Sequence, residues 1–166
     1  MIPSVHIHLR DAVAADFEAI LRLNVESEHF LSPLDLGLLE ALHAQAVHRR
    51  VIEVDGTVRG FLLALREGTP YQSLNYRWFC DRYAQFLYID RVVVDAAVRG
   101  QRLGLRLYED VFARARAQGI QRITCEYDID PPNEGSRQFH ARLGFREVGT
   151  QRAAGGKAVS MQELML

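Results

Sequence analysis

Lysine, cysteine and long apolar runs are scarce in this sequence. Lys157 is the single lysine among 20 basic residues, a ratio that we attribute to background composition rather than to function. The two cysteines, Cys80 and Cys125, form no Cys-x-x-Cys pair, which excludes a disulfide framework and fits reduced thiols in a cytoplasmic protein. No apolar run approaches the ~18 residues that span a bilayer. Residues 1–10 show no basic flank followed by an apolar stretch, so we expect no secretory signal.

An excess of charge of one sign is also missing. Lys and Arg total 20 and Asp and Glu total 21, so the formal net charge is −1. A protein without a basic field has no general means of holding nucleic acid or an anionic membrane, and we expect neither as a partner. The six histidines are scattered without a His-Glu-x-x-His motif, so we expect no metal site.

The chain is long enough for one domain with its own core. It has 166 residues, 48% of them hydrophobic, so we expect a single domain over residues 1–166. Hydrophobic periodicity predicts strands at 5–10, 50–54, 57–66, 86–94, 122–127, 145–150 and 158–165, and helices at 16–26, 33–46, 103–119 and 133–143. The order β-α-α-β-β-β-α-β-α-β-β indicates an α/β fold with a mixed sheet flanked by helices.

Local signals mark several ends of these elements. Asp55-Gly56 predicts a tight hairpin turn. Ser32-Pro33 predicts an N-cap followed by proline at the first helical position. Asn133 predicts the cap of a helix that ends at Gly144. We expect the last strand, 158–165, to lie at an edge of the sheet, where it could support a homodimer.

The connection 67–85 is long and rich in aromatic residues. Six of the chain's 15 aromatic residues fall within the 16 residues from Tyr71 to Phe86. A long connection inside a compact domain is usually a functional loop or a misread element. We expect part of it, around residues 75–82, to be helical.

A glycine-containing turn follows the strongest predicted strand, 86–94. The segment Arg99-Gly100-Gln101-Arg102-Leu103-Gly104 leads into a helix. The first N–H groups of a helix have no intrahelical partners and carry the positive end of its dipole. Glycine lets the backbone approach a ligand closely, so this turn suits a phosphate or pyrophosphate. A plain strand-to-helix turn is the alternative, and a P-loop is excluded because no Gly-Lys-Ser/Thr follows.

Two segments together resemble a known family. The first is Val94-x-x-x-x-Arg99-Gly100-Gln101-Arg102-Leu103-Gly104, which is similar to the acetyl-CoA pyrophosphate loop of GNAT-type N-acetyltransferases. The second is Asn133-x-x-Ser136-x-x-Phe139-His140-x-x-Leu143-Gly144-Phe145, which resembles that family's second motif. The order of the predicted elements also resembles the GNAT fold along nearly the whole chain.

The resemblance implies an acetyl-CoA site made largely of backbone groups. Pantetheine would pair with the central strand, splayed there from its neighbour by a bulge, at Val92, Val93 and Val94. The pyrophosphate would be held by backbone N–H groups of Arg99, Gly100, Gln101, Arg102, Leu103 and Gly104. Asn133 would reach the pantetheine or its thiol end. Arg102 stands where the family has a glycine, which is tolerable if its φ is negative; its side chain would pair with a CoA phosphate or lie exposed.

The implied reaction is direct attack of a primary amine on acetyl-CoA in a ternary complex. The acceptor would be a small molecule, an amino-acid-like compound or a peptide amine. His140 replaces the family's tyrosine and is the candidate acid for the departing thiolate, the alternative being a helix histidine packed near CoA. Loss of that tyrosine leaves a second function open, a non-catalytic domain that binds acyl-CoA.

Carboxylates on neighbouring predicted strands are candidates for the base. Asp90 and Tyr88 share one face of their strand, because side chains alternate with period two. Glu126 and Asp128 on the next strand are the second choice. An ion pair of Asp90 with a nearby arginine, such as Arg91 or Arg82, is the structural alternative.

The aromatic-rich connection falls where the family forms the wall of the acceptor site. Tyr76, Trp78 and Tyr83, together with Glu126, are the residues expected to contact the acceptor. Aromatic rings near Asp81 and Asp90 would suit a cationic amine through cation–π contacts and ion pairing. A small core beneath a long loop would explain the same rings equally well.

Overall fold

The protein is described by a computed structural model over residues 2–152 and 154–166. The chain forms two compact units. One comprises the residues up to Ala64 together with Arg91–Val111, and the other comprises Leu65–Asp90 together with Phe112–Leu166.

Antiparallel strands form the sheet of the first unit. β1 (Ile7–Asp11) pairs with β2 (His48–Val54), which pairs with β3 (Thr57–Arg66). The predicted hairpin turn between β2 and β3 is confirmed: Asp55 and Gly56 have φ values of 50° and 80°. Two successive left-handed residues match the twist of the flanking strands, which is why Asp-Gly is favoured there.

Two helices of the first unit bury their apolar stripes, α1 (Phe17–Glu26) and α2 (Leu36–Gln45). The predicted N-cap of α2 at Ser32 is wrong. Asp35 caps the helix instead, since its Oδ1 accepts the N–H of Leu38 at 2.8 Å. The hydroxyl and carbonyl of Ser32 each accept a hydrogen bond from the Arg91 guanidinium at 3.3 Å, so Ser32 belongs to the connection before the helix.

The second unit combines a short helix, α3 (Leu74–Cys80), with the beginning of β4 (Leu87–Val94) and four later elements. These are β5 (Arg122–Asp130), α5 (Glu134–Leu143), β6 (Arg146–Arg152) and β7 (Ala158–Met165). The helix expected around 75–82 is therefore confirmed. As predicted, Asn133 caps α5 by accepting the N–H of Ser136, and Gly144 ends it with φ 95°.

The prediction that the last strand lies at a sheet edge is wrong. β7 pairs antiparallel with β5 on one side and with β6 on the other. Glu163 shows why this position is stable: its buried carboxylate accepts hydrogen bonds from Arg122 of β5 and Arg146 of β6. Sequence alternation reports which face of a strand is apolar and does not report which strands lie beside it.

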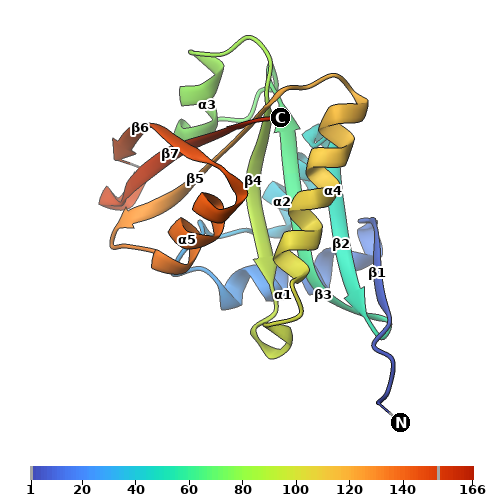
Figure 1. Ribbon diagram of the computed structural model, residues 1–166. Helices are drawn as coiled ribbons and strands as arrows, with labels where there is room; N and C mark the ends of the chain where they lie inside the picture. The colour runs from blue at the N-terminus through green and yellow to red at the C-terminus, as the bar shows by residue number, and fades with distance from the viewer. Residues whose placement is uncertain (1, 153) are drawn as a thin grey trace. The chain divides into compact units, whose positions relative to one another are not determined.

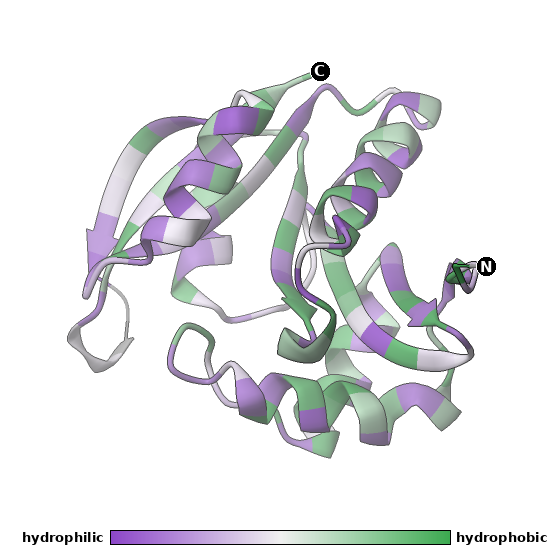
Figure 2. Ribbon diagram, turned by 60° about the horizontal axis from the view of Figure 1, so that its bottom comes forward, coloured by the Kyte–Doolittle hydropathy of each residue, from purple (hydrophilic) through white to green (hydrophobic). Residues whose placement is uncertain are grey.

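The strands follow the hydrogen-bonded order β1-β2-β3-β4-β5-β7-β6, and β4 is parallel to β5 (Figure 1). The mixed α/β architecture predicted from the sequence is confirmed. α4 (Leu103–Ala117) follows β4 through the glycine-containing turn. Polar and apolar bands alternate along the helices (Figure 2), as expected of helices with one buried face.

Each unit has its own set of buried side chains. In the first unit they include Ile20, Leu39, Val51, Phe61 and Leu107. In the second they include Tyr76, Phe79, Phe86, Tyr88 and Met161. Among the helices of the described residues, none is long and apolar enough to cross a membrane.

Candidate active site

The turn after β4 is fixed by Asp95. One carboxylate oxygen of Asp95 accepts the N–H of Ala97 at 3.0 Å, and the other accepts a hydrogen bond from the Arg59 guanidinium at 2.9 Å. The Asp95 N–H donates to the Arg59 carbonyl at 2.7 Å. The hydrogen bond from Ala97, followed by that from Arg59, lowers the pKa of Asp95, so this anchor is ionised at neutral pH.

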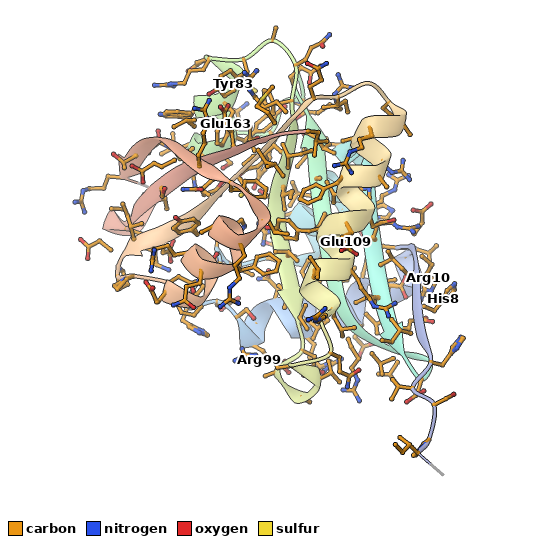
Figure 3. The ribbon with its side chains drawn as sticks, viewed as in Figure 1. His8, Arg10, Tyr83, Arg99, Glu109 and Glu163 are labelled. Carbon is orange, nitrogen blue, oxygen red and sulfur yellow. The ribbon has the colours of Figure 1, made fainter. Side chains whose placement is uncertain are left out.

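The loop between this anchor and α4 has left-handed backbone at two positions, Gly100 and Arg102. Gly100 has φ 89°, and no atom lies within 4 Å of the place where a Cβ would stand. Arg99 precedes it on the loop (Figure 3). The Arg106 N–H donates to the Arg102 carbonyl, which begins the helical hydrogen bonds of α4.

An arginine at position 102 was expected to be tolerable if its φ were negative, and its φ is not negative. Its φ is 58°, in the left-handed region where the family's glycine would be unstrained. An L-residue in this region costs about 1–2 kcal/mol, because its Cβ crowds the following carbonyl. We expect Arg102→Gly to recover part of that strain and to raise the midpoint of urea unfolding. An unchanged or lower midpoint would show that the Arg102 side chain compensates the strain through contacts of its own.

A buried phenol and a carboxylate meet in the second unit. The Tyr88 hydroxyl on β4 donates to Glu126 Oε1 on β5 at 2.8 Å. Asn75 Nδ2, on α3, donates to the same oxygen at 3.2 Å. The parallel ladder of β4 with β5 comprises the pairs Leu87↔Ile123 and Tyr88↔Thr124 among the described residues, so Asp90 lies beyond it. The structure thus brings two sequence-predicted residues, Tyr88 and Glu126, into direct contact.

Electrostatics keeps the Tyr88 phenol protonated. Burial raises the pKa of Tyr88 well above 10, and the negative charges of Glu126 and Asp90 raise it further. The phenol is therefore a hydrogen-bond donor at neutral pH. Both predicted carboxylates lie close enough to act on it electrostatically.

His140 is buried in the second unit, with 4% of its surface exposed. Its Nδ1 lies 2.7 Å from the Ser136 carbonyl, which assigns the proton to Nδ1 and leaves Nε2 as an acceptor in the neutral ring. The imidazole stacks on Tyr127 with ring centroids 5.5 Å apart. Burial lowers the pKa of His140 below its ordinary 6.5, so the neutral form predominates at pH 7.

Asn133, predicted to contact pantetheine, serves locally as the N-cap of α5. Its Oδ1 accepts the Ser136 N–H at 3.2 Å. A cap of this kind uses the amide oxygen and leaves the amide nitrogen free to serve a ligand.

The aromatic residues of the 67–85 connection divide between core and surface. Tyr76 and Phe79 are fully buried, and the Tyr76 hydroxyl donates to the Arg66 carbonyl at 2.6 Å, so these two belong to the core. Trp78 is half-buried, with the Arg82 guanidinium 3.6 Å from its ring centroid. Tyr83 lies beside Glu163 (Figure 3) and beneath the Arg122 guanidinium, 3.8 Å from the ring centroid.

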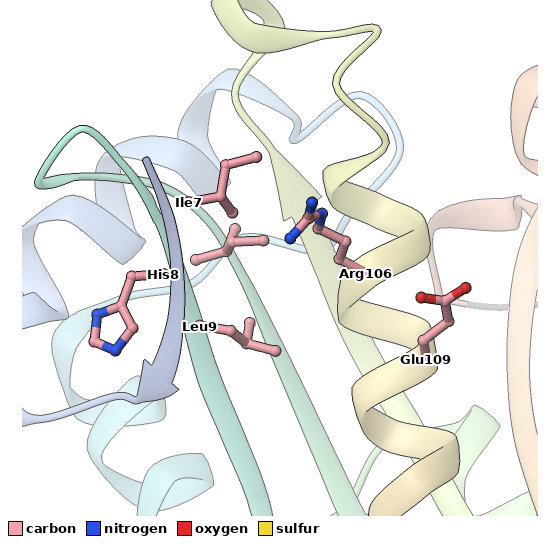
Figure 4. Close-up of a pocket in the computed structure, with 6 residues that line it drawn as sticks. Ile7, His8, Leu9, Arg106 and Glu109 are labelled. Atoms are coloured by element: carbon pink, nitrogen blue, oxygen red, sulfur yellow. The ribbon is translucent and has the colours of Figure 1, made fainter. Parts of the chain in front are cut away.

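A shallow pocket of about 300 Å³ lies in the first unit between β1 and α4 (Figure 4). Its lining residues are Ile7, His8, Leu9, Ile52, Arg106 and Glu109. None of these was predicted for the site from the sequence.

Asn75 and Gln151 are the residues that sequence reasoning missed. Gln151 Nε2 donates to Asn75 Oδ1 at 2.8 Å, and Asn75 in turn donates to Glu126. The predicted helix around 75–82 included Asn75. No spacing rule, however, relates Asn75 to Glu126, which is 51 positions away in the sequence, or to Gln151, which is 76 positions away.

A family model described as the Acetyltransferase (GNAT) family matches residues 11–145. Two curated relatives, both named phosphinothricin N-acetyltransferase, are similar to parts of the chain. The protein from Streptomyces coelicolor is 39% identical over 66 residues, which are 40% of this chain and 37% of that protein. The protein from Streptomyces viridochromogenes is 33% identical over 110 residues, which are 64% of this chain and 51% of that protein. The chain thus spans about half the length of these relatives, or less.

The fold is shared with a solved structure of Ard1 from Thermoplasma volcanium. The TM-score is 0.79 at 17% sequence identity, and the match covers 96% of this chain and 97% of that chain. At this level of identity the likeness concerns the fold alone.

Proposed function

This chain belongs to the acetyltransferase (GNAT) family, and on that basis we propose that it transfers the acetyl group of acetyl-CoA to a primary amine by direct attack. The observation that carries the proposal is the 2.8 Å hydrogen bond from the Tyr88 phenol to the Glu126 carboxylate. A carboxylate held by a protonated phenol is suited to bind an ammonium group and to accept its proton.

For the acyl donor, we assign the pyrophosphate to the loop from Arg99 to Gly104. Support comes from the left-handed Gly100, whose Cβ position is open, and from the start of α4 directly after the loop. Backbone groups of Val92, Val93 and Val94 are assigned to pantetheine, and Asn133 is assigned to the same arm. Backbone N–H groups would supply much of the local positive potential at this loop. A phosphate site of this kind is therefore compatible with the protein's net charge of −1.

For the acceptor, we assign the amine to the two carboxylates Glu126 and Asp90. Both raise the pKa of Tyr88 through their charge, which supports their position near the same phenol. A cationic amine would replace the hydration of these carboxylates with an ion pair. Loss of one proton to Glu126, directly or through a water, then gives the neutral amine that can attack.

The transfer itself follows from these assignments. The amine nitrogen forms a bond to the thioester carbon, and the carbonyl oxygen becomes an oxyanion that a backbone N–H near Val92 or Val93 would stabilise. Collapse of this intermediate breaks the carbon–sulfur bond. The second proton leaves the nitrogen to water, and the departing thiolate takes up one proton, for which His140 is our candidate donor. His140 then regains its proton from solvent. The products are the N-acetylated amine and CoA.

The role of His140 predicts a specific pH dependence. The imidazolium donates a proton and the neutral form does not, so kcat should fall as pH rises through the pKa of His140. Because burial lowers that pKa, the fall should lie below pH 6.5. His140→Phe should remove this limb of the kcat–pH profile. Full kcat with the same profile in the variant would exclude His140 as the acid.

A thiol-release assay tests the function as a whole. Purified protein, acetyl-CoA and a panel of small, amino-acid-like and peptide amines should release CoA only when a suitable amine is present. Mass spectrometry should find the acetylated amine in equal amount. Acetyl-CoA binding without transfer to any amine of the panel would favour an acyl-CoA-binding domain instead.

A further inference from the structure

The short helix α3 docks on strand β6 through Trp78 and Gly149. A Cβ at Gly149 would lie 2.5 Å from Cζ2 and 2.9 Å from Cη2 of Trp78, closer than such atoms approach in proteins. The indole therefore occupies space that only a glycine leaves. This contact fixes α3 against β6 within the second unit.

The same two faces carry a hydrogen bond beside this contact. Asn75 lies three residues before Trp78, on the same side of α3, and Gln151 lies two residues after Gly149, on the same side of β6. Asn75, Trp78, Gly149 and Gln151 are all half-buried, unlike Thr150 between the last two. Gln151 Nε2 accordingly reaches Asn75 Oδ1 at 2.8 Å.

This hydrogen bond holds the Asn75 amide in the orientation in which its nitrogen faces Glu126. With its oxygen accepting from Gln151, its nitrogen is turned to Glu126 Oε1, to which it donates at 3.2 Å. The reversed amide would set its oxygen against the carboxylate and its NH₂ group against the Gln151 donor, two repulsive contacts. Gln151 thus acts on Glu126 through Asn75.

The buried side of α3 supports the other donor to the same carboxylate. Tyr76 and Phe79 contact the Tyr88 ring, with centroids 5.4 Å and 5.8 Å away. The Tyr88 hydroxyl donates to Glu126 Oε1 as well. One short helix therefore positions both donors to this oxygen, Asn75 by a hydrogen bond and Tyr88 by packing.

We propose that Asn75 and Gln151 are positioning residues that act in series to orient and stabilise the Glu126 carboxylate for the acceptor amine. This inference rests on the proposed function, because it assigns Glu126 to the amine. It adds that the proposed activity depends on α3 and β6. The side-chain amides of Asn75 and Gln151, although uncharged, would set the pH below which activity is lost.

The test compares Asn75→Leu, Gln151→Leu and the double variant in the full chain. Losing a donor destabilises the charged carboxylate, so the acid-side limb of kcat/KM for the amine should move to higher pH, by roughly 0.5–1 unit in Asn75→Leu. Gln151→Leu should shift the limb in the same direction by less. The double variant should match Asn75→Leu, because residues in series have no separate effect. KM for acetyl-CoA should stay unchanged.

Controls separate positioning from general damage. Gln138→Leu removes a similar amide bond, to exposed Glu134 at 3.2 Å in the same unit, and should shift nothing. Gly149→Ala, which displaces Trp78 without touching the carboxylate, should shift the limb as Asn75→Leu does. Unchanged limbs, or additive shifts in the double variant, would overturn the proposal while leaving acetyl transfer intact.

A second readout makes the inference independent of activity. The side-chain carboxyl carbon of Glu126, followed by NMR during a pH titration, should titrate at higher pH in Asn75→Leu than in the wild type. If the wild type acetylates no amine, the proposed function fails, and this titration still decides whether Asn75 stabilises the carboxylate. Identical midpoints in the two proteins would overturn the positioning role.

Discussion

Replacing Glu126 with glutamine should lower kcat/KM for the amine by ~10²- to 10⁴-fold, the range found for removal of a general base. Glutamine keeps the shape of the side chain and an oxygen that accepts from the Tyr88 hydroxyl, so the packing of the second unit should survive. What the variant loses is the negative charge that would bind the ammonium and take its proton. Steady-state kinetics with varied amine and saturating acetyl-CoA would measure the loss.

Glu147→Gln is the matched control for this experiment. Glu147 lies on β6 of the same unit and is exposed, where it accepts a hydrogen bond from Ser160 at 2.6 Å. Its neutralisation should leave kcat/KM within about twofold, since surface substitutions rarely act beyond their neighbours. A Glu126→Gln enzyme that keeps wild-type kcat/KM would transfer the role of base to Asp90, which Asp90→Asn would then test.

Gly60→Ala should have the largest effect on stability. Gly60 is buried on β3, and an added Cβ would lie 2.8 Å from the Val93 carbonyl oxygen and 3.0 Å from Cγ2 of Ile52. The first of these is backbone, which cannot rotate away, so β4 must shift. Overpacking of this kind costs about 1–3 kcal/mol, which should lower Tm by roughly 2–12 °C in a chain of this size. Thermal unfolding followed by circular dichroism measures it.

Gly37→Ala makes the same substitution where it should have the opposite sign. Gly37 is exposed in α2, and its nearest contact for a Cβ is Asp35 Oδ1 at an ordinary 3.6 Å. Gly37 is the second residue of the helix, where alanine is favoured over glycine by at most the ~0.5–1 kcal/mol of a helix interior, so Tm should rise. If Gly60→Ala left Tm unchanged or raised it as Gly37→Ala does, the close approach of β3 and β4 at Val93 would be wrong. Any shift of β4 should also raise KM for acetyl-CoA, because Val93 and Val94 are assigned to pantetheine.

Much of the fold was predictable because the signals that specify it are local. Asp55-Gly56 requires two left-handed residues in succession, Asn133 offers an oxygen to its own helix, and Gly144 supplies the left-handed residue that ends it. Each requirement is met within a few residues. The loop from Arg99 to Gly104 was found for the same reason, since its glycine and the helix after it are neighbours in sequence.

Only part of the candidate site was predictable: Tyr88 and Glu126 were found from the sequence, whereas Asn75, Gln151 and the hydrogen bonds among these residues were not. Tyr88 and Glu126 were both chosen from their strands, but their hydrogen bond links positions 38 residues apart. Ser32, predicted to cap α2, instead accepts a hydrogen bond through its hydroxyl from the guanidinium of Arg91, 59 residues further along the chain. The left-handed φ of Arg102 was not predictable either, because residue type alone favours the opposite sign there.

The sequence by itself determined the family and the order of the elements, and it predicted the glycine-containing loop from Arg99 to Gly104, because these follow from periodicity, from glycine positions and from two spaced motifs. Only the tertiary structure decided that β7 lies between β5 and β6, and that Asn75 and Gln151 reach the Glu126 carboxylate. The physical reason is the same for both. Strand pairing and side-chain hydrogen bonds depend on which groups lie close together in space. A pattern of alternating residues does not indicate which distant segment of the chain will lie beside a given strand or side chain.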